Sequence, residues 1–412
     1  MTTSGVLAGP DPALGMESAA DHLARLGPVP GVEARLIDVL DRSELRGRGG
    51  ASFPVGSKWR SIARGKRSRA VVLANGSEGE PLSGKDRLLM QCRPHLVIDG
   101  AFLAAATVKA DDVVFYIGED HGAAADAMRR ALAERSDAPA RARLVPAPAR
   151  YVAGEESAAV HCVNDAVALP QTTPPRPYER GVGGRPTLVQ NVETLAHVGL
   201  IARRGDEWFR ACGRGTASGT TLVTVSSGAP RSTVLEVAQG TTVAEAVTEA
   251  GRSTDGVGAV LLGGFFGSWV AADEAWRLPL DSVGLRATGR SLGCGVIGLL
   301  DHGDCGVRVT ATIATFLGEQ SAQQCGPCVF GLRAIAEALQ RIAGLEPQAH
   351  DLARLRTWAT EVRGRGACRH PDGAAGFVLS ALDVFEIEFA RHSQQLGCTT
   401  SASSQRPDRW TW

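Results

Sequence analysis

Apolar runs and amphipathic stretches alternate through the first third of the chain. Val71–Leu73 and Val113–Ile117 are continuous apolar runs of the length expected for buried strands. Leu96–Val108 and Ala123–Arg135 are long enough for helices. This order predicts an α/β fold with a parallel sheet and right-handed crossovers. A further short amphipathic helix is predicted from the spacing of Val32, Leu36, Val39 and Leu40.

The pattern changes near residue 219. Leu222–Val225 and Val234–Val237 predict paired short strands, a helix is predicted to start at Thr242, and Ala259–Leu262 predicts another strand. This ββαβ order predicts a small α+β domain over residues 219–285, followed by a linker over residues 286–310.

Helical periodicity dominates the last quarter of the chain. Three apolar stripes predict a small helical bundle over residues 311–395. Residues 1–30 lack a clear period and residues 396–412 are mostly polar, so we expect an N-terminal tail and a disordered C-terminal tail. The stripes are Val329, Leu332, Ile335, Leu339 and Ile342; then Leu352, Leu355, Trp358 and Val362; then Val378, Leu382, Phe385 and Phe389.

Composition narrows the class of protein. The 412 residues carry 44 basic and 44 acidic side chains, and this balance makes a dedicated nucleic-acid binder improbable. The sequence shows neither a signal-peptide pattern nor an apolar run long enough to span a bilayer. Its 9 cysteines are unevenly spread, which favours thiols or metal ligands over a disulfide framework. We therefore expect a soluble cytoplasmic protein.

Two neighbouring stretches carry the first candidate chemistry. Gly47, Gly49 and Gly50 form a glycine-dense turn, and Lys58 follows. Glycines let backbone N–H groups approach an anion closely, and a lysine adds a point charge. The strand beginning at Val71 then ends in the polar sequence Asn75-Gly76-Ser77-Glu78-Gly79-Glu80. Ligands of α/β proteins bind at the carboxyl ends of strands, so the two stretches predict a phosphate cradle beside a polar pocket.

Cysteines provide the second candidate site. Cys325 and Cys328 form a CxxC motif at the predicted start of the first bundle helix, and Cys368 lies between the second and third helices. This arrangement is typical of a metal or iron–sulfur site, and a pair of buried thiols is the alternative. Gly293–Gly298 also fits the pattern GxGxxG, but a strand-like run follows it, so we do not interpret it as a dinucleotide fingerprint.

Several motifs, in order, resemble the flavoprotein subunit of respiratory complex I and the flavin subunits of NAD-linked hydrogenases and formate dehydrogenases. The resemblance covers roughly residues 32–395 of the 412. It rests on GRGGASFPVGSKW (Gly47–Trp59), NGSEGEP (Asn75–Pro81), KDR (Lys85–Arg87), YVAGEESA (Tyr151–Ala158) and PTLVQNVET (Pro186–Thr194).

The resemblance implies an FMN-dependent oxidoreductase that takes a hydride from NADH or NADPH and passes single electrons through an iron–sulfur cluster to a ferredoxin-like partner. It implies an FMN- and nucleotide-binding domain over residues 31–215, a ubiquitin-like fold for residues 219–285, and a cluster in the bundle. Glu80 would reach the nicotinamide, and Glu156 would lie near the flavin, in orienting rather than proton-abstracting roles. Solvated helix-end charges are the alternative for these acids. The remaining implied cofactor-binding residues are Gly49, Gly50, Phe53, Lys58, Asn75, Glu78, Tyr151, Gly154, Glu155, Asn191 and Thr194.

One departure concerns the cluster. The family's segment has four cysteines, and here Cys325, Cys328 and Cys368 match three of them while Ala322 stands at the fourth. Three outcomes are open: a [4Fe–4S] cluster with a substitute ligand, a three-cysteine site holding a [3Fe–4S] cluster or an open iron, or loss of the cluster. The candidate substitute ligands are Cys294, Cys305 and His370.

Other departures concern the nucleotide. Phe53 keeps one of the aromatic residues that stack on adenine in the family, but Ser61 and Arg176 replace two others, and Thr173 replaces a basic residue. A guanidinium suits both stacking and a 2′-phosphate, so NADH and NADPH both stay open. Ser77 and Gln190 are smaller departures on the flavin side. Two rival functions follow from these changes: a cofactor-depleted subunit kept for assembly, and a scaffolding subunit of a larger redox complex.

Overall fold

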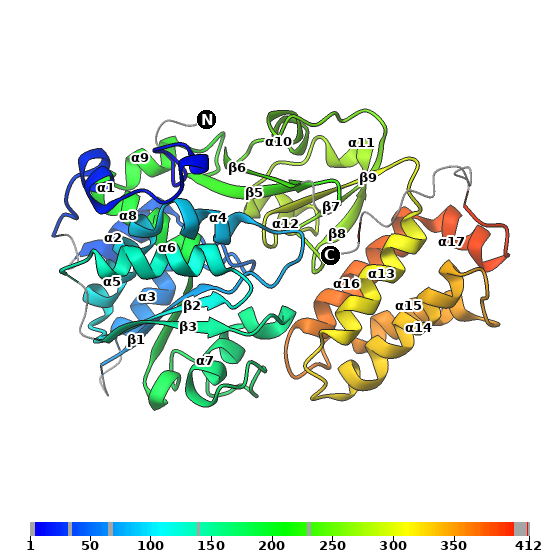
Figure 1. The fold of residues 1–412 in the computed structure, drawn as a ribbon. Helices are drawn as coiled ribbons and strands as arrows, with labels where there is room; N and C mark the ends of the chain where they lie inside the picture. The colour runs from blue at the N-terminus through cyan, green and yellow to red at the C-terminus, as the bar shows by residue number, and fades with distance from the viewer. Residues whose placement is uncertain are drawn as a thin grey trace. The chain divides into compact units, whose positions relative to one another are not determined.

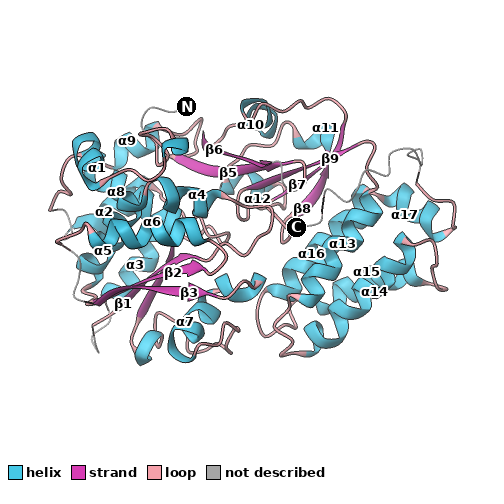
Figure 2. Ribbon diagram, in the orientation of Figure 1, coloured by secondary structure: helices cyan, strands magenta, loops and turns pink. Residues whose placement is uncertain are grey.

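The computed structural model describes residues 5–31, 35–64, 69–137, 141–228, 232–398 and 410 (Figures 1 and 2). The chain divides into two compact units. The first comprises Met1–Gly79, Gly84–Val223 and Glu236–Thr241, and the second comprises Glu80–Ser83, Thr224–Leu235 and Thr242–Trp412. Each unit is described separately below.

The first unit is built on a parallel four-stranded sheet of order β3-β2-β1-β4. The predicted strands are confirmed as β1 (Val71–Gly76) and β2 (Asp112–Gly118), and the parallel arrangement is confirmed as well. The sequence pattern did not predict β3 (Arg141–Ala147) or β4 (Thr187–Asn191). β3 alternates charged and apolar residues and is largely accessible, and β4 is only five residues long, so neither forms the long apolar run of a central strand.

Helices cover both faces of this sheet. Val72 and Ala74 point into a core with α5 and α8, whereas Val71 and Leu73 point into a second core with α7. This alternation follows from the two-residue period of a strand. Three predicted helices are confirmed, at α2, α5 and α6. The helices are α2 (Leu36–Ser43), α3 (Val55–Ala63), α4 (Lys85–Cys92), α5 (Pro94–Val108), α6 (Gly122–Ala133), α7 (Glu156–Asp165), α8 (Val192–Arg204) and α9 (Asp206–Ala211). Val32, which we included in the first helical stripe, lies outside the described residues.

The N-terminal segment, expected to be a tail, contains helix α1 (Ala19–Leu26). The backbone N–H groups of Val6 and Leu7 each donate to the carboxylate of Glu236 at 2.9 Å. A Cβ atom at Gly5 would lie 2.1 Å from the same carboxylate, so only glycine fits there. The segment is therefore anchored to the first unit.

The second unit contains a mixed five-stranded sheet of order β6-β5-β9-β7-β8. Its strands β5 (Thr220–Ser226), β6 (Ser232–Ala238) and β7 (Val257–Leu262) are those predicted, and helix α10 (Val243–Glu249) begins after Thr242 as expected. The linker prediction for residues 286–310 is wrong, because that range contains the central strand β9 (Val296–Asp301). The added elements are β8 (Ser268–Ala271), α11 (Ala272–Ala275) and α12 (Ser282–Ala287).

Strand β9 explains the error. It pairs parallel with β5 and antiparallel with β7, so it completes the sheet from a distant part of the chain. The Gly293–Gly298 segment leads into this strand rather than into a helix, which confirms that it is not a dinucleotide fingerprint.

The predicted bundle is confirmed, with an additional first helix. Its helices are α13 (Gly306–Glu319), a π-helical turn (Pro327–Leu332), α14 (Arg333–Ala343), α15 (Asp351–Val362), α16 (His370–Val384) and α17 (Glu386–Ser393). Val329 lies in the π-helical turn and is 40% exposed, so it is not part of the apolar stripe. At the far end of the chain, Trp410 is buried and its ring lies 5.8 Å from that of Trp269, while residues 399–409 lie outside the described part. Within the described residues, no helix combines the length and apolar character required to cross a bilayer.

Candidate functional site

The order of the parallel sheet creates a switch point between β1 and β4. The chain builds outward from β1 through β2 to β3 and then returns to place β4 on the other side of β1. Helices that follow two such strands leave on diverging paths, and ligands bind in the crevice at the carboxyl ends. Asn75 and Asn191 are paired residues at these two carboxyl ends. The sheet therefore brings together two of the predicted cofactor-binding residues that are far apart in sequence.

The glycine turn packs against the same edge. The N–H group of Arg48 donates to the hydroxyl of Thr194 at 2.9 Å, and a Cβ atom at Gly49 would lie 3.3 Å from the Cβ of Asn191. Gly50 has φ +99°, a conformation that side-chain-bearing residues avoid. The turn begins and ends at an isolated antiparallel bridge between Arg46 and Pro54. Gly49, Asn191 and Thr194 thus lie together, as predicted.

This edge of the sheet has the donors that a flavin nucleotide requires. Within the described part of the chain, the backbone N–H groups of Gly49 and Gly50 have no protein acceptor. Asn75 uses its side-chain amide to bind the carbonyl of Gly154 at 2.9 Å, which ties the loop before α7 to β1. A Cβ atom at Gly154 would lie 2.7 Å from the Ser77 hydroxyl, so this close approach also requires glycine. Free backbone donors beside a partly exposed Lys58 are suited to an anionic ligand such as the phosphate of FMN.

A buried charge network, which we did not predict, supports the asparagine pair. Asn191 donates to Asp86 at 2.7 Å, and the Lys85 ammonium lies 2.7 Å from Asp86 and 2.8 Å from Glu193. Glu193 also lies 3.8 Å from the Arg48 guanidinium and accepts the N–H of Leu222 at 2.8 Å. The motifs KDR and NVET contain three of these residues, but only the fold shows that their charges face one another.

Burial and neighbouring charges perturb this network strongly. Burial raises the pKa of Asp86 to about 7 despite the nearby Lys85. Burial opposes the ionisation of Glu193 as well, but Lys85, His197 and Arg48 overcome it and lower the pKa of Glu193 to about 2. Burial lowers the pKa of Arg48 to about 10. Glu193 is therefore the permanent anion that balances the two buried cations.

The predicted acids of the first unit have mostly structural contacts. Glu155 is the N-cap of α7, where its carboxylate accepts the N–H groups of Ser157 and Ala158 at 2.9 and 3.0 Å. Glu78 accepts the N–H groups of Asp86 and Arg87 in the first turn of α4, and its own φ is +41°. Helix-end stabilisation, the alternative weighed for these acids, accounts for both contacts. A direct flavin contact of Glu78 or Glu155 stays a prediction.

Lys58 and Glu156 form a partly exposed ion pair with an N–O distance of 3.2 Å. Lys58 lies on α3 and Glu156 begins α7, so the pair connects the two segments that flank the asparagine pair. Phe53, at the end of the glycine turn, is 56% exposed, and Tyr151 is partly exposed at the start of the loop before α7. An exposed aromatic ring beside a polar edge is suited to stacking on a ligand.

Glu80 belongs to the second unit. It is buried, and its carboxylate accepts the N–H groups of Phe265 at 2.8 Å and Leu82 at 3.4 Å. These donors fix the orientation of the carboxylate. A Cβ atom at Gly264 would lie 2.7 Å from the same carboxylate, so the loop after β7 approaches Glu80 too closely for a larger residue. The predicted role of Glu80 beside the nicotinamide is untested by these contacts.

The three cysteines of the bundle converge. The thiols of Cys325 and Cys328 contact each other, and Cys328 lies within electrostatic reach of Cys368. Burial raises the pKa of Cys328 to about 12, whereas the N–H groups of Ala367 and Cys328 outweigh burial and lower the pKa of Cys325. Backbone N–H groups directed at sulfur, and a π-helical turn at the site, are both typical of cluster-binding segments. The donor set fits an iron–sulfur cluster with three cysteine ligands.

The structure separates the candidate substitute ligands from one another. Cys305 precedes α13, a helix of 14 residues, and the CxxC motif follows that helix. At 1.5 Å per residue the helix spans roughly 20 Å, so Cys305 is too distant to ligate the same cluster. Cys294 contacts the carbonyl of Gly263 at 3.4 Å in the loop before β9. The Nε2 of His370 lies 2.7 Å from the carbonyl of Leu317, so the N–H is on that nitrogen and the lone pair is on Nδ1.

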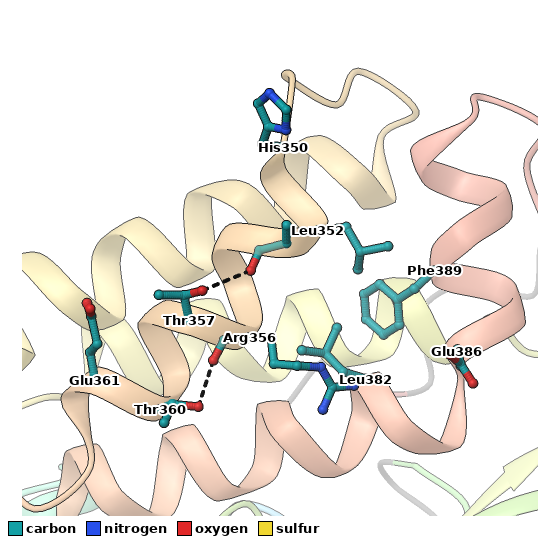
Figure 3. A pocket seen from close by; sticks show the side chains of 10 residues that line it. His350, Leu352, Arg356, Thr357, Thr360, Glu361, Leu382, Glu386 and Phe389 are labelled. Carbon is teal, nitrogen blue, oxygen red and sulfur yellow. Dashed lines mark hydrogen bonds between the residues drawn. The ribbon is translucent and has the colours of Figure 1, made fainter.

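A hollow of about 900 Å³ lies on the bundle, away from the cysteines in sequence (Figure 3). Leu352 and Leu382 contribute apolar surface, whereas Arg356 and Glu386 contribute charge at its edge. Arg356 is already paired with Asp383 at 2.9 Å. None of the predicted site residues lines this hollow, so we assign it no role in the chemistry.

Comparison with known proteins supports this division of the chain. Residues 40–200 match the family model of the Nuo51 FMN-binding domain, and residues 308–392 match that of the NADH-ubiquinone oxidoreductase-F iron-sulfur binding region. The first match contains the glycine turn and the asparagine pair, and the second contains Cys325, Cys328 and Cys368. The two matches define the class: an FMN-binding oxidoreductase with an iron–sulfur region.

Individual relatives are similar over most of their length. An NADH-quinone oxidoreductase-F protein of Rhizobium meliloti (strain 1021), the second of that name, is 31% identical over 378 residues, which cover 88% of this chain and 90% of that protein. NADP-reducing hydrogenase subunit HndC of Solidesulfovibrio fructosivorans is 27% identical over 380 residues, 89% of this chain and 77% of that protein. The chain therefore belongs to the NADH-quinone oxidoreductase-F family.

The fold agrees with a solved structure of the same kind. An NAD+-reducing [NiFe]-hydrogenase in the H2-reduced state matches with a TM-score of 0.80 and 28% identity. The match covers 90% of this chain and 63% of the hydrogenase chain. The chain thus spans less than two thirds of the length of that hydrogenase chain.

Proposed function

We propose that this chain is the flavoprotein subunit of a multi-subunit oxidoreductase, in which it oxidises NADH or NADPH with bound FMN and passes the electrons through an iron–sulfur cluster. The observation that carries this proposal is the pairing of Asn75 and Asn191 at the β1/β4 switch point, beside glycine-turn N–H groups that have no acceptor among the described residues. The family assignment supports the same reaction class.

Each residue of the first unit has a distinct part in holding FMN. The N–H groups of Gly49 and Gly50, with Lys58, hold the anionic end of the cofactor. Asn75, Asn191 and Thr194 line its other side, and Phe53 provides the surface on which the nucleotide stacks. When bound, FMN accepts two electrons as a hydride and releases them one at a time.

The acids orient the site. Glu156 sets the position of Lys58 through their ion pair. Glu80, held by two backbone N–H groups, presents a fixed carboxylate to the nucleotide. Neither acid needs to remove a proton, since hydride transfer requires no general base. Cys325, Cys328 and Cys368 hold the cluster that accepts the single electrons.

We further propose that the electron acceptor is a separate ferredoxin-like protein. The names of the relatives describe subunits of quinone-reducing and hydrogenase enzymes, so a partner chain completes the electron path.

The test is anaerobic purification followed by flavin and iron analysis and an NADH- and NADPH-ferricyanide assay on the same sample. About one FMN per chain with several irons and activity with either nucleotide support the proposal. Lys58→Met is expected to weaken FMN retention about tenfold, as the loss of one charge-assisted contact predicts. Lys109→Met, which changes a lysine at the end of α5 away from the glycine turn, is the matched control. Absence of both cofactors after reconstitution would refute the proposal.

Ala322 favours a second candidate, a subunit that keeps the fold for assembly without electron transfer. The residue is 7% exposed at the position of the family's missing cysteine, and an alanine cannot ligate iron. Flavin with no iron and no ferricyanide activity, together with stable incorporation into a larger complex, would favour this candidate.

A further inference from the structure

A second cluster of metal-ligating side chains lies at the other end of α13. Cys305 precedes the first turn of that helix, His392 lies near the end of α17, and Cys398 follows in the segment after it. The ligand atoms of all three residues lie within 4.8 Å of one another. The function proposed above does not use these residues.

We propose that Cys305, His392 and Cys398 form a binding site for a zinc-type divalent metal ion, separate from the iron–sulfur cluster. The Nε2 atom of His392 lies 3.5 Å from the sulfur of Cys305 and 3.1 Å from that of Cys398. In a tetrahedral zinc site the metal–sulfur and metal–nitrogen bonds place neighbouring sulfur and nitrogen ligands about 3.5 Å apart. The side chains therefore have nearly the spacing of a bound state, and little rearrangement is needed.

The orientation of the imidazole supports a metal rather than a simple thiol contact. The Nδ1 atom of His392 lies 3.1 Å from the carbonyl oxygen of Ile342, so Nδ1 carries the proton and donates to it. This leaves the Nε2 lone pair directed at the two sulfurs. A backbone carbonyl that fixes the tautomer in this way is the usual outer contact of a histidine that ligates zinc. His392 is fully buried, so water does not compete for Nε2.

The surroundings also suit a thiolate pair. The backbone N–H groups of Val307 and Arg308, in the first turn of α13, face the sulfur of Cys305. These donors and the positive end of the helix stabilise negative charge on sulfur. Two thiolates and one neutral imidazole are borderline-soft ligands that select zinc over magnesium or calcium. Because Cys305 and Cys398 are both partly exposed, an ion can enter from solvent, and water can complete the fourth position.

The site is independent of the three cluster cysteines. The length of α13 separates the two sets of ligands by roughly 20 Å. The metal would connect the start of α13 to α17 and to the segment at Cys398, which closes the bundle that carries Cys325, Cys328 and Cys368. Its role is therefore structural, and loss of the metal should loosen the bundle before it affects the flavin.

The test uses the full-length chain, purified anaerobically without chelator and then titrated with Co²⁺ and Zn²⁺. We expect one equivalent of Co²⁺ to bind with thiolate-to-cobalt charge transfer, and Zn²⁺ to displace it. Cys305→Ser, Cys398→Ser and His392→Gln should each weaken binding more than about 100-fold, beyond the effect of changing an outer contact. The three variants are separate, so a folding failure of one leaves two others to decide.

Two controls make the result specific. Cys212→Ser removes a partly exposed cysteine of the first unit and should leave cobalt binding unchanged. The combined Cys325→Ser, Cys328→Ser and Cys368→Ser variant should lose iron but keep the cobalt spectrum. Cobalt binding that survives His392→Gln, or disappears in the combined variant, overturns the proposal. A Cys305–Cys398 disulfide in the anaerobically isolated protein overturns it too, because a disulfide leaves no thiolates to bind a metal.

Discussion

Glu193→Gln tests the buried charge network beneath the asparagine pair. The carboxylate is fully buried, lies 2.8 Å from the Lys85 ammonium, and has a pKa lowered from 4.5 to about 2. At 1.36 kcal/mol per pKa unit, a shift of that size corresponds to about 3 kcal/mol of folding stability. Removal of one partner of a buried ion pair costs a similar amount, about 3–5 kcal/mol, because the other charge is left uncompensated.

The substitution isolates the charge. Glutamine has nearly the same shape and keeps an oxygen for the N–H of Leu222, which donates to Glu193 at 2.8 Å. Hydrogen exchange of the Leu222 amide is therefore a local probe of the network. A loss of about 3 kcal/mol should speed its exchange roughly a hundredfold. Asp126→Asn changes an exposed acid of the same unit, paired with Arg129, and should cost less than about 0.5 kcal/mol.

The pH dependence provides a second check. Because the folded pKa of Glu193 is depressed, its stabilisation is fully present above pH 4.5 and is lost as the pH falls towards about 2. The stability difference between the parent chain and Glu193→Gln should therefore shrink over that window. A difference below about 1 kcal/mol at neutral pH would refute the reasoning, because it would mean that desolvation cancels the attraction between Glu193 and Lys85.

Three further predictions concern other parts of the chain. Ala322→Cys restores the family's fourth cysteine, and we expect iron and sulfide content to rise towards a four-iron cluster, whereas Ala314→Cys on α13 should leave it unchanged. Asp99 and Glu17 raise the pKa of His22 against the effect of burial, so its stabilisation is fully present below pH 6.5 and is lost as the pH rises through the higher folded value; the urea midpoint of His22→Gln should approach that of the parent chain over this range, and a constant gap would contradict the assignment. Thr242 and Glu245 form a capping box at α10, so Thr242→Ala should cost about 1 kcal/mol in thermal unfolding, with Thr248→Ala as the control and an equal loss in both as the contrary result.

Local periodicity predicted the elements that are long or uniformly apolar. β1, β2 and α5 pack on both sides or in a core, so their sequences carry strong signals. β9 was assigned to a linker because its place in the sheet depends on pairing with β5, about 70 residues earlier, and no local pattern records that contact.

The candidate site was predictable only as separate motifs. Asn75 and Asn191 come from recognised motifs, but their adjacency depends on β4, which was not predicted. The network of Lys85, Asp86 and Glu193 was missed, since each residue alone is typical of a helix start exposed to water. The cluster of Cys305, His392 and Cys398 depends on the closure of the bundle and has no motif at all.

The anchoring of Val6 and Leu7 by Glu236 has a consequence for the order in which the protein is made. Val6 is separated from its carboxylate partner by 230 residues. At 5–20 residues per second, a ribosome needs roughly ten to fifty seconds to synthesise the intervening chain. Over that time the segment around Val6 waits for a partner that is not yet translated. A bulky fusion ahead of this segment would meet the tight space around Gly5, so an expression tag there should impair maturation more than its small size suggests.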